Sequence, residues 1–294
     1  MRRISRGTSP RAWLAVLLLV PISLLPRPVA AQREVPVERG ARLALSSLSG
    51  TLVIQGWERD MVRLERGEGS VRTTSRSGTV RVVTDRPRGP GSFHLQIPAW
   101  MAVTVDGINL DVTVGDVLAP IRVETVNGDI RVEGGREEIR LESVSGAVRL
   151  ENGRGMIRLE SVHGNLVGER LAGEVRAETT NGSVVLRDVE LRELQAESVN
   201  GDLTWDGPVY AGGRYTLGTH NGSVRVRLPA TTDAVVTTTT WHGDLRSDFP
   251  VRTTPGAPGR TIQFTLGSGG SARIVLTTFQ GGIVLERRAP PPSR

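Results

Sequence analysis

The chain has 294 residues, with 37 basic side chains that are all arginine, 31 acidic side chains and no cysteine. The lack of cysteine excludes disulfides, thiol nucleophiles and thiolate metal sites, and the lack of lysine excludes Schiff-base chemistry. Five of the arginines and none of the acids fall in residues 1–31, so the rest of the chain carries 32 arginines against 31 acids, a net charge of +1. The basic isoelectric point of the whole chain is therefore no argument for nucleic-acid binding.

Residues 1–31 have the pattern of a secretory signal sequence. Arg2 and Arg3 precede an apolar run over residues 14–25, and Ala31 ends a small-residue cleavage site. The run is too short to span a membrane, and no second apolar run of that length follows. We expect export to the periplasm or the cell surface, with the mature chain beginning at Gln32; an uncleaved anchor is the alternative.

One twelve-residue phrase recurs eleven times, and residues 121–132 give its clearest copy, Ile-Arg-Val-Glu-Thr-Val-Asn-Gly-Asp-Ile-Arg-Val. Ten copies have Gly at position 8, ten have Ser or Thr at position 5, and all have an aliphatic residue at position 10. The regular copies begin every 18 residues, and the later steps are 19, 21 and 21 residues. Such a repeat indicates a fold built by stacking. The copies begin at Leu43, Val71, Val103, Ile121, Ile139, Ile157, Val175, Leu194, Tyr215, Val236 and Ile274.

Each copy predicts two short strands. Ile121 and Val123 alternate with Arg122 and Glu124, which is typical of a half-buried strand, and an Asn-Gly turn leads into a second strand. Glycine and β-branched residues dominate the mature chain, and this composition disfavours helix. Two architectures fit these elements: an antiparallel meander of tight hairpins, and a β-solenoid in which like positions stack in parallel.

Two observations favour the solenoid. The apolar step of three from Val123 to Val126 indicates a bend before the Asn-Gly turn, and the columns keep their identity from copy to copy. We therefore predict an all-β, single-chain β-solenoid (β-helix) of about eleven coils over residues 32–288, with the regular coils at about 103–247 and 18–21 residues per coil. Loops are expected near residues 86–91 and 255–259, and a disordered tail at 289–294.

Several phrases resemble a known family. They are Gly-Thr-Leu-Val-Ile-Gln-Gly-Trp at residues 50–57, Phe-His-Leu-Gln-Ile-Pro at 93–98, the Val-Asn-Gly-Asp-Ile coils, and Gly-Gly-Ile-Val-Leu at 281–285. Over about residues 35–288 the chain resembles the bacterial "putative adhesin" family of domains of unknown function. The resemblance implies an exported β-solenoid of the cell envelope, and the family has no established catalytic residues to carry over. Gly107 and Leu110 depart from the pattern, which leaves the register of the third copy open.

Charged residues recur at two positions of the phrase. Position 4 is acidic in six consecutive copies, and position 2 is Arg in four of those six, so stacking would align like charges at a spacing of ~4.8 Å. The repulsion between such carboxylates is about 1 kcal/mol per pair in water, and the arginines could offset it. The column is either a solvated ladder of salt bridges or a strip that binds cations or a charged polymer. This candidate binding face comprises Asp106, Glu124, Glu142, Glu160, Glu178, Glu197, Arg122, Arg140, Arg158 and Arg176.

Histidine and tryptophan give weaker candidates. His220 and His242 fall at or beside the turn of two successive copies, near Asp244, which suggests a metal site or simply polar turn residues. Three tryptophans could stack on sugars, although filling the core is the simpler interpretation. They are Trp57, Trp205 and Trp241.

These features predict a non-enzymatic exported envelope protein that acts as an adhesin-like binding or scaffold module and needs no cofactor. Its partner would be an envelope protein or a glycan. One alternative is a polysaccharide-acting β-helix enzyme, a lyase or hydrolase, which would need carboxylates that converge in a cleft with perturbed pKa values. Another is an accessory or regulatory protein of the envelope-stress response.

Overall fold

The structure, a computed structural model, describes residues 34–66, 70–74, 78–83, 91–251 and 261–288. Within these ranges the chain forms 24 β-strands and no helix, and all of them belong to one compact unit, residues 31–294. The predicted signal sequence, the tail at 289–294 and most of the two expected loops lie outside the described residues.

In the centre of the stack each coil contributes two strands joined by a corner. The pairs are β8 (Ile121–Asn127) with β9 (Ile130–Gly134), β10 (Arg136–Ser145) with β11 (Val148–Glu151), β12 (Arg154–Ser161) with β13 (Leu166–Glu169), β14 (Ala172–Asn181) with β15 (Val184–Arg187), β16 (Glu190–Asn200) with β17 (Leu203–Asp206), and β18 (Arg214–Asn221) with β19 (Val224–Leu228). We call the side of the coil formed by the first strand of each pair the first face and the other side the second face.

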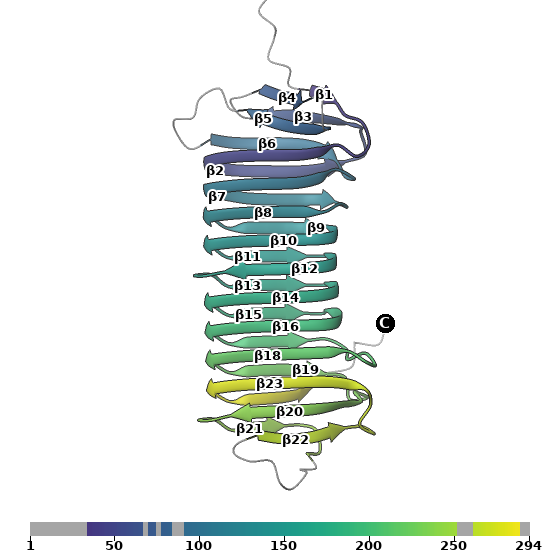
Figure 1. The fold of residues 1–294 in the computed structure, drawn as a ribbon, viewed down its shortest axis with the longest axis vertical. Helices are drawn as coiled ribbons and strands as arrows, with labels where there is room; N and C mark the ends of the chain where they lie inside the picture. The colour runs from purple at the N-terminus through teal and green to yellow at the C-terminus, as the bar shows by residue number, and fades with distance from the viewer. Residues whose placement is uncertain (1–33, 67–69, 75–77, 84–90, 252–260, 289–294) are drawn as a thin grey trace, which may run out of the picture. The chain divides into compact units, whose positions relative to one another are not determined.

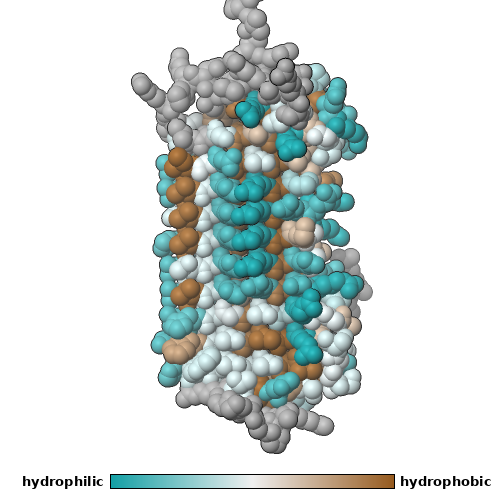
Figure 2. Space-filling model, viewed as in Figure 1, coloured by the Kyte–Doolittle hydropathy of each residue, from teal (hydrophilic) through white to brown (hydrophobic). Residues whose placement is uncertain are grey.

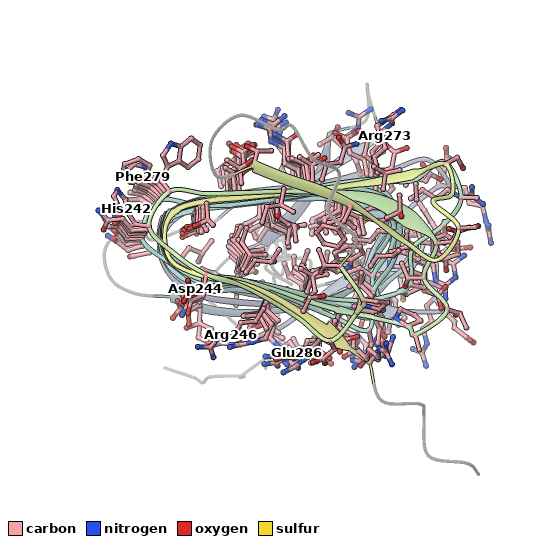
Figure 3. The ribbon with its side chains drawn as sticks, turned by 90° about the horizontal axis from the view of Figure 1, so that it is seen from below. His242, Asp244, Arg246, Arg273, Phe279 and Glu286 are labelled. Carbon is pink, nitrogen blue, oxygen red and sulfur yellow. The ribbon has the colours of Figure 1, made fainter. Side chains whose placement is uncertain are left out.

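Like positions of neighbouring coils pair in parallel and in register. Ile139 pairs with Ile121 on one side and with Ile157 on the other. Figure 1 shows the resulting stack, and Figure 3, which looks along it, shows a flattened coil with two long sides. The β-solenoid prediction is therefore confirmed, and the hairpin meander is wrong for these coils.

At the N-terminal end two long strands each run through both faces. They are β2 (Arg42–Trp57) and β7 (Ala102–Val117), which pair with each other, and β7 also pairs with β8 and β9. On the outer side of β2, β5 (Thr79–Val83) and β6 (Gly91–Pro98) together make the next layer. Short antiparallel strands then pair with this end: β1 (Glu34–Pro36), β3 (Met61–Arg66) and β4 (Ser70–Thr74).

The copy that begins at Val71 is not a coil, contrary to the prediction. Its first residues form β4, which runs antiparallel to β5, so Val71 pairs with Val82 of its own hairpin. Val80, at position 10 of this copy, pairs with Leu43, at position 1 of the first coil. The last layer has no further coil to stack on, so the chain folds back on itself there.

At the C-terminal end the stacking order differs from the chain order. The final coil, β23 (Ala272–Gln280) with β24 (Ile283–Arg287), lies between β18/β19 and the coil of β20 (Ala234–Thr240) with β21 (Leu245–Ser247). Outside them, β22 (Thr261–Leu266) pairs antiparallel with β20. Figure 1 shows β23, in yellow, above the green β20. The copies at Tyr215 and Val236 are therefore not neighbours.

The core fills the space between the two faces. Positions 1, 3 and 5 of the first strand and positions 10 and 12 of the second point inward, as in Ile139, Leu141 and Val148, which are fully buried. Val126 is 41% exposed, because Thr125 takes the inward place and the alternation continues unbroken. The bend predicted from the apolar step of three is therefore wrong, and a column of aliphatic side chains is left outside the core.

Close contact between backbones explains the glycine column. A Cβ on Gly146 would lie 1.9 Å from the carbonyl oxygen of Gly128, and one on Gly164 would lie 1.9 Å from that of Gly146. Gly146, Gly164 and Gly182, the last of which follows Asn181, have no positive φ, so at these positions the reason is the close approach and not the left-handed conformation expected of an Asn-Gly turn.

The two exceptions in the third copy compensate for each other. Leu110 stays in register at position 8, and its side chain is fully buried. A Cβ on Gly107, at position 5, would lie 2.6 Å from the Cβ of Leu110. The leucine therefore occupies the corner space that a Ser or Thr fills in other coils, and the register that was open from the sequence is the regular one.

Candidate functional site

In the coils from Ile121 onward, the corner is held by the side-chain hydroxyl at position 5. Ser161 donates to the carbonyl oxygen of Gly146 at 3.1 Å, and Thr179 donates to that of Gly164 at 3.0 Å. Each hydroxyl thus bonds to the position-8 carbonyl of the neighbouring coil and not to another hydroxyl. Thr278, whose partner is Gly222, follows the stacking order and not the chain order.

At position 7, side-chain amides add links in two stretches of the same corner where Asn occupies neighbouring coils. Asn127 donates to Asn109 at 2.8 Å, and Asn221 donates to Asn200 at 2.7 Å. Because amides can donate and accept in one plane, they link consecutive coils at the surface. The corner is therefore a hydrogen-bonded spine that fixes the side chains on either side of it.

The acidic column predicted at position 4 is present on the first face. Strand pairing places Asp106, Glu124, Glu142, Glu160, Glu178 and Glu197 in successive coils. Four of these glutamates bond to the Arg at position 2 of their own coil, and Glu197 accepts from Gln195 at 2.8 Å. The hydrogen bond to Glu142 raises the pKa of Arg140. The ten residues of the predicted face are therefore brought together, as two adjacent columns.

Position 6 forms an exposed aliphatic column that the sequence analysis missed. Figure 2 shows it as a brown line along one edge of the first face, interrupted once. Its aliphatic members are each 39–45% exposed, and Thr180 occupies the position in the Val175 coil. They are Ile108, Val126, Val144, Val162 and Val199. The Ser or Thr at position 5, as in Thr125, continues the inward alternation of positions 1 and 3 and so places position 6 outside. This pattern in the sequence could have identified the column.

A groove of about 940 Å³ runs between the acidic column at position 4 and the aliphatic column at position 6. In each central coil one wall is the acid, the floor is the Ser or Thr, and the other wall is the aliphatic residue, as in Glu142, Ser143 and Val144. Because the glutamates lean toward the position-2 arginines, their carboxylates lie along the outer rim. The groove is therefore aliphatic inside, with negative charge along one edge.

Aromatic side chains close the C-terminal end of the groove. Phe279 stacks on His220 with ring centroids 4.7 Å apart, and lies 5.8 Å from Trp241 and 5.4 Å from His242. Figure 3 shows Phe279 and His242 together at the curved edge of the coil. Three of these rings occupy position 6, so the cluster continues the aliphatic column.

The predicted metal candidates are not brought together. The coil that carries Phe279 separates His220 from His242, and Asp244 lies past the corner toward the other long side (Figure 3). In the part of the chain that the structure describes, no group of three His, Asp or Glu side chains could hold a metal ion. The expectation that the two histidines lie on adjacent coils is wrong because β23 stacks between them.

The three tryptophans have different environments. Trp205 is fully buried and stacks on Tyr215 at 4.6 Å, which confirms the core interpretation. Trp57 is half-buried and donates to the carbonyl oxygen of Met61 at 2.8 Å. Trp241 is 46% exposed at the groove end, so the core interpretation is wrong for this residue.

Comparison with known proteins identifies the family that the repeat resembles. Residues 168–281 match the Toastrack domain, DUF4097. The resemblance to a family of domains of unknown function is thereby confirmed. No curated protein matches the chain.

A solved structure with detectable similarity is the crystal structure of a "putative cell adhesion protein" from Clostridium sporogenes ATCC 15579. It is 12% identical, the match covers 87% of this chain and 98% of that chain, and the TM-score is 0.21. A TM-score this low supports no inference about fold or function.

The Toastrack segment begins within an ion-pair network on the second face. Glu169 lies within 3.1 Å of Arg149, 3.6 Å of Arg187 and 3.7 Å of Arg170. A hydrogen bond from Arg149, the largest effect, lowers the pKa of Glu151. The second face is thus cross-linked by charge between coils, whereas the Arg–Glu pairs of the acidic column on the first face lie within coils. Among the described residues no helix has the length and apolarity to span a membrane.

Proposed function

We propose that the protein is an exported, non-enzymatic, adhesin-like binding module of the cell envelope, and that the groove of the first face is its binding surface. The observation that carries the proposal is the repeated construction of this groove over the six coils from Asp106 to Glu197, beyond which the aromatic cluster with Trp241 closes its end. A surface that repeats the same three residues coil after coil is suited to an elongated partner.

The setting of the acids supports binding over catalysis. Glu124, Glu142, Glu160 and Glu178 each bond to an arginine two residues earlier, so none of these four carboxylates is distinguished from the others. A glycosidase needs two carboxyl groups with different roles, one of them held protonated. A straight ladder of equivalent ion pairs does not supply that difference.

The assignment to the envelope rests on the sequence. The arginines, apolar run and small-residue site of residues 1–31 favour export. An exported chain without cysteine needs another source of rigidity, and the parallel ladders and corner hydrogen bonds supply it. The proposed partner is an envelope protein or glycan at the periplasmic or cell-surface side.

The proposal is tested by retention of the purified mature chain on cell-envelope fragments. We expect binding well above that of an unrelated β-solenoid, and expect Val126→Glu plus Val162→Glu to abolish it. Position 6 already carries Thr180 and His220, so the substitutions should not unfold the chain, which circular dichroism would verify.

The matched control places the same changes on the second face, as Val167→Glu plus Val185→Glu. Their side chains are half-buried at position 11, and we expect them to leave binding intact if the fold is retained. Binding no greater than that of the unrelated solenoid would refute the proposal. Equal loss in both folded variants would place the partner elsewhere.

A further inference from the structure

The length and spacing of the groove restrict what it can hold. Its lining spans nine stacked coils, from the Val103 coil to the Val236 coil, which is eight steps of ~4.8 Å or about 38 Å. A partner that lies along it meets a carboxylate on one wall in the six coils from Asp106 to Glu197. On the other wall it meets aliphatic side chains, with Thr180 once among them, and then the aromatic cluster at the C-terminal end.

The charge of the groove determines which charge its partner should carry. The rim carries six acids, and arginines at position 2 pair with four of them. Asp106 and Glu197 have no arginine at position 2 of their own coils. Residues 121–205, which hold most of the groove, contain 11 Arg and 16 acids, a net charge of −5. The groove therefore favours cationic groups at its rim and apolar groups inside.

The repeat distance selects a peptide conformation. A polyproline II helix rises ~3.1 Å per residue with three residues per turn, so like side chains recur about every 9.3 Å. Two coils of the stack span ~9.6 Å. Over the whole groove the two periods drift apart by only about 1 Å.

Other peptide conformations match less well. An α-helix, with a pitch of ~5.4 Å, drifts by about 5 Å over eight coils. An extended strand repeats its facing side chains every ~6.6 Å, which fits neither one coil nor two. Aromatic-lined grooves are also characteristic of surfaces that bind polyproline II segments, and the exposed Trp241 and the half-buried Phe279 supply such rings at the groove end.

We propose that the groove binds a proline-rich, cationic polypeptide segment of about twelve residues in the polyproline II conformation. One face of the segment places Arg or Lys at the acidic rim, and another packs prolines on the position-6 column and on Trp241. The inference rests on the proposed binding function and names the class of its partner.

The test uses a fluorescein-labelled (Pro-Pro-Arg)4 peptide and the mature chain, measured by fluorescence anisotropy. We expect saturable binding that is at least about five-fold tighter than that of (Gly-Gly-Arg)4, which has the same charge but no preformed helix. Val144→Thr plus Val162→Thr should weaken binding at least about five-fold. The second-face pair Val167→Thr plus Val185→Thr should change it less than about two-fold.

Three outcomes would overturn the proposal. The two peptides could bind equally, which indicates charge alone; the groove variant could bind as tightly as the unchanged chain; or neither peptide could bind. Envelope fragments separate this failure from that of the proposed function. If the protein still binds the fragments through the groove, or if envelope glycan competes with the fragments for the groove, only the ligand class is wrong. If they are not retained either, the proposed function fails as well.

Discussion

At the scale of single residues, the corner of a coil depends on one contact between a glycine of one coil and a Ser or Thr of the next. The glycine lets neighbouring backbones approach, and the hydroxyl of the next coil donates to the carbonyl oxygen that the glycine presents. Ser161 and Gly146 show the arrangement, and Thr278 and Gly222 repeat it where chain order and stacking order differ.

Replacing a corner glycine is expected to destabilise the stack. A Cβ in Gly164→Ala would meet the carbonyl oxygen of Gly146 at 1.9 Å, and backbone cannot move aside as a side chain can. We expect a loss of about 1–3 kcal/mol or more, seen as a lower midpoint in urea denaturation. Gly218→Ala is the control, because nothing lies within 4 Å of its Cβ. Equal losses in both would contradict the close-contact explanation.

The corner hydroxyl is expected to contribute about 1 kcal/mol. Thr179→Val keeps the shape of the side chain but removes the donor to the carbonyl oxygen of Gly164. Its exposed neighbour gives the matched control, Thr180→Val, which should change the free energy of unfolding by less than about 0.5 kcal/mol. An unchanged stability for Thr179→Val would show that the hydroxyl is dispensable.

The columns of the sequence repeat correctly predicted which side chains point into the core, but they predicted the exposed side chains poorly. Position 10 and the Ser/Thr corner could be identified because burial and close packing fix those residue types. The exposed aliphatic column was missed because an aliphatic residue near an Asn-Gly turn was assigned to the core. In fact Thr125 satisfies its hydroxyl inside the corner, which leaves Val126 outside.

At the scale of elements, the order of coils is not encoded in the repeat. Every copy offers the same columns, so the Ile274 coil can stack on Tyr215 or on Val236, and in the structure it pairs with both. Sequence spacing gave the coils but not their order. The antiparallel pairing of β22 with β20 occupies the outer side of that coil and leaves the inner side for β23.

Cysteine pairs test this order directly in a chain that has no native cysteine. Thr216 and Val275 pair in neighbouring strands, a separation compatible with a disulfide. We expect Thr216→Cys with Val275→Cys to form an intramolecular disulfide on mild oxidation, visible as a mobility shift on non-reducing gels. Thr216→Cys with Thr237→Cys should not, because β23 separates these strands. A disulfide in the second pair and none in the first would show that these coils stack in chain order.

The ion pairs of the second face give a pH dependence. Because hydrogen bonding lowers the pKa of Glu151 in the folded state, its contribution to stability is present above the unfolded pKa and is lost as the pH falls through the folded pKa. Glu151→Gln should lower the free energy of unfolding by about 0.5–1 kcal/mol at pH 7, and the difference should shrink as the pH falls below the unfolded pKa and vanish below the lowered pKa of Glu151. The exposed Glu174→Gln of β14 serves as the control. A difference that persists in acid would assign the effect to packing.

At the scale of the whole folded unit, the stack converts a short phrase into a surface. One acid, one hydroxyl and one aliphatic residue recur over the central coils as two walls and a floor, and the aromatic cluster extends the groove to a length of about 38 Å. Figure 2 shows these columns side by side on the first face. The resemblance to the Toastrack family gives no partner, so the groove itself is the best guide to function.

Site-specific photo-cross-linking tests most directly whether the first face is the binding surface. A photoreactive phenylalanine would replace Val144 in the groove or Val185 on the second face, and each mature chain would be irradiated with cell-envelope fragments. We predict covalent adducts from position 144 and none from position 185. Adducts from position 185 alone, or equally from both, would contradict the account.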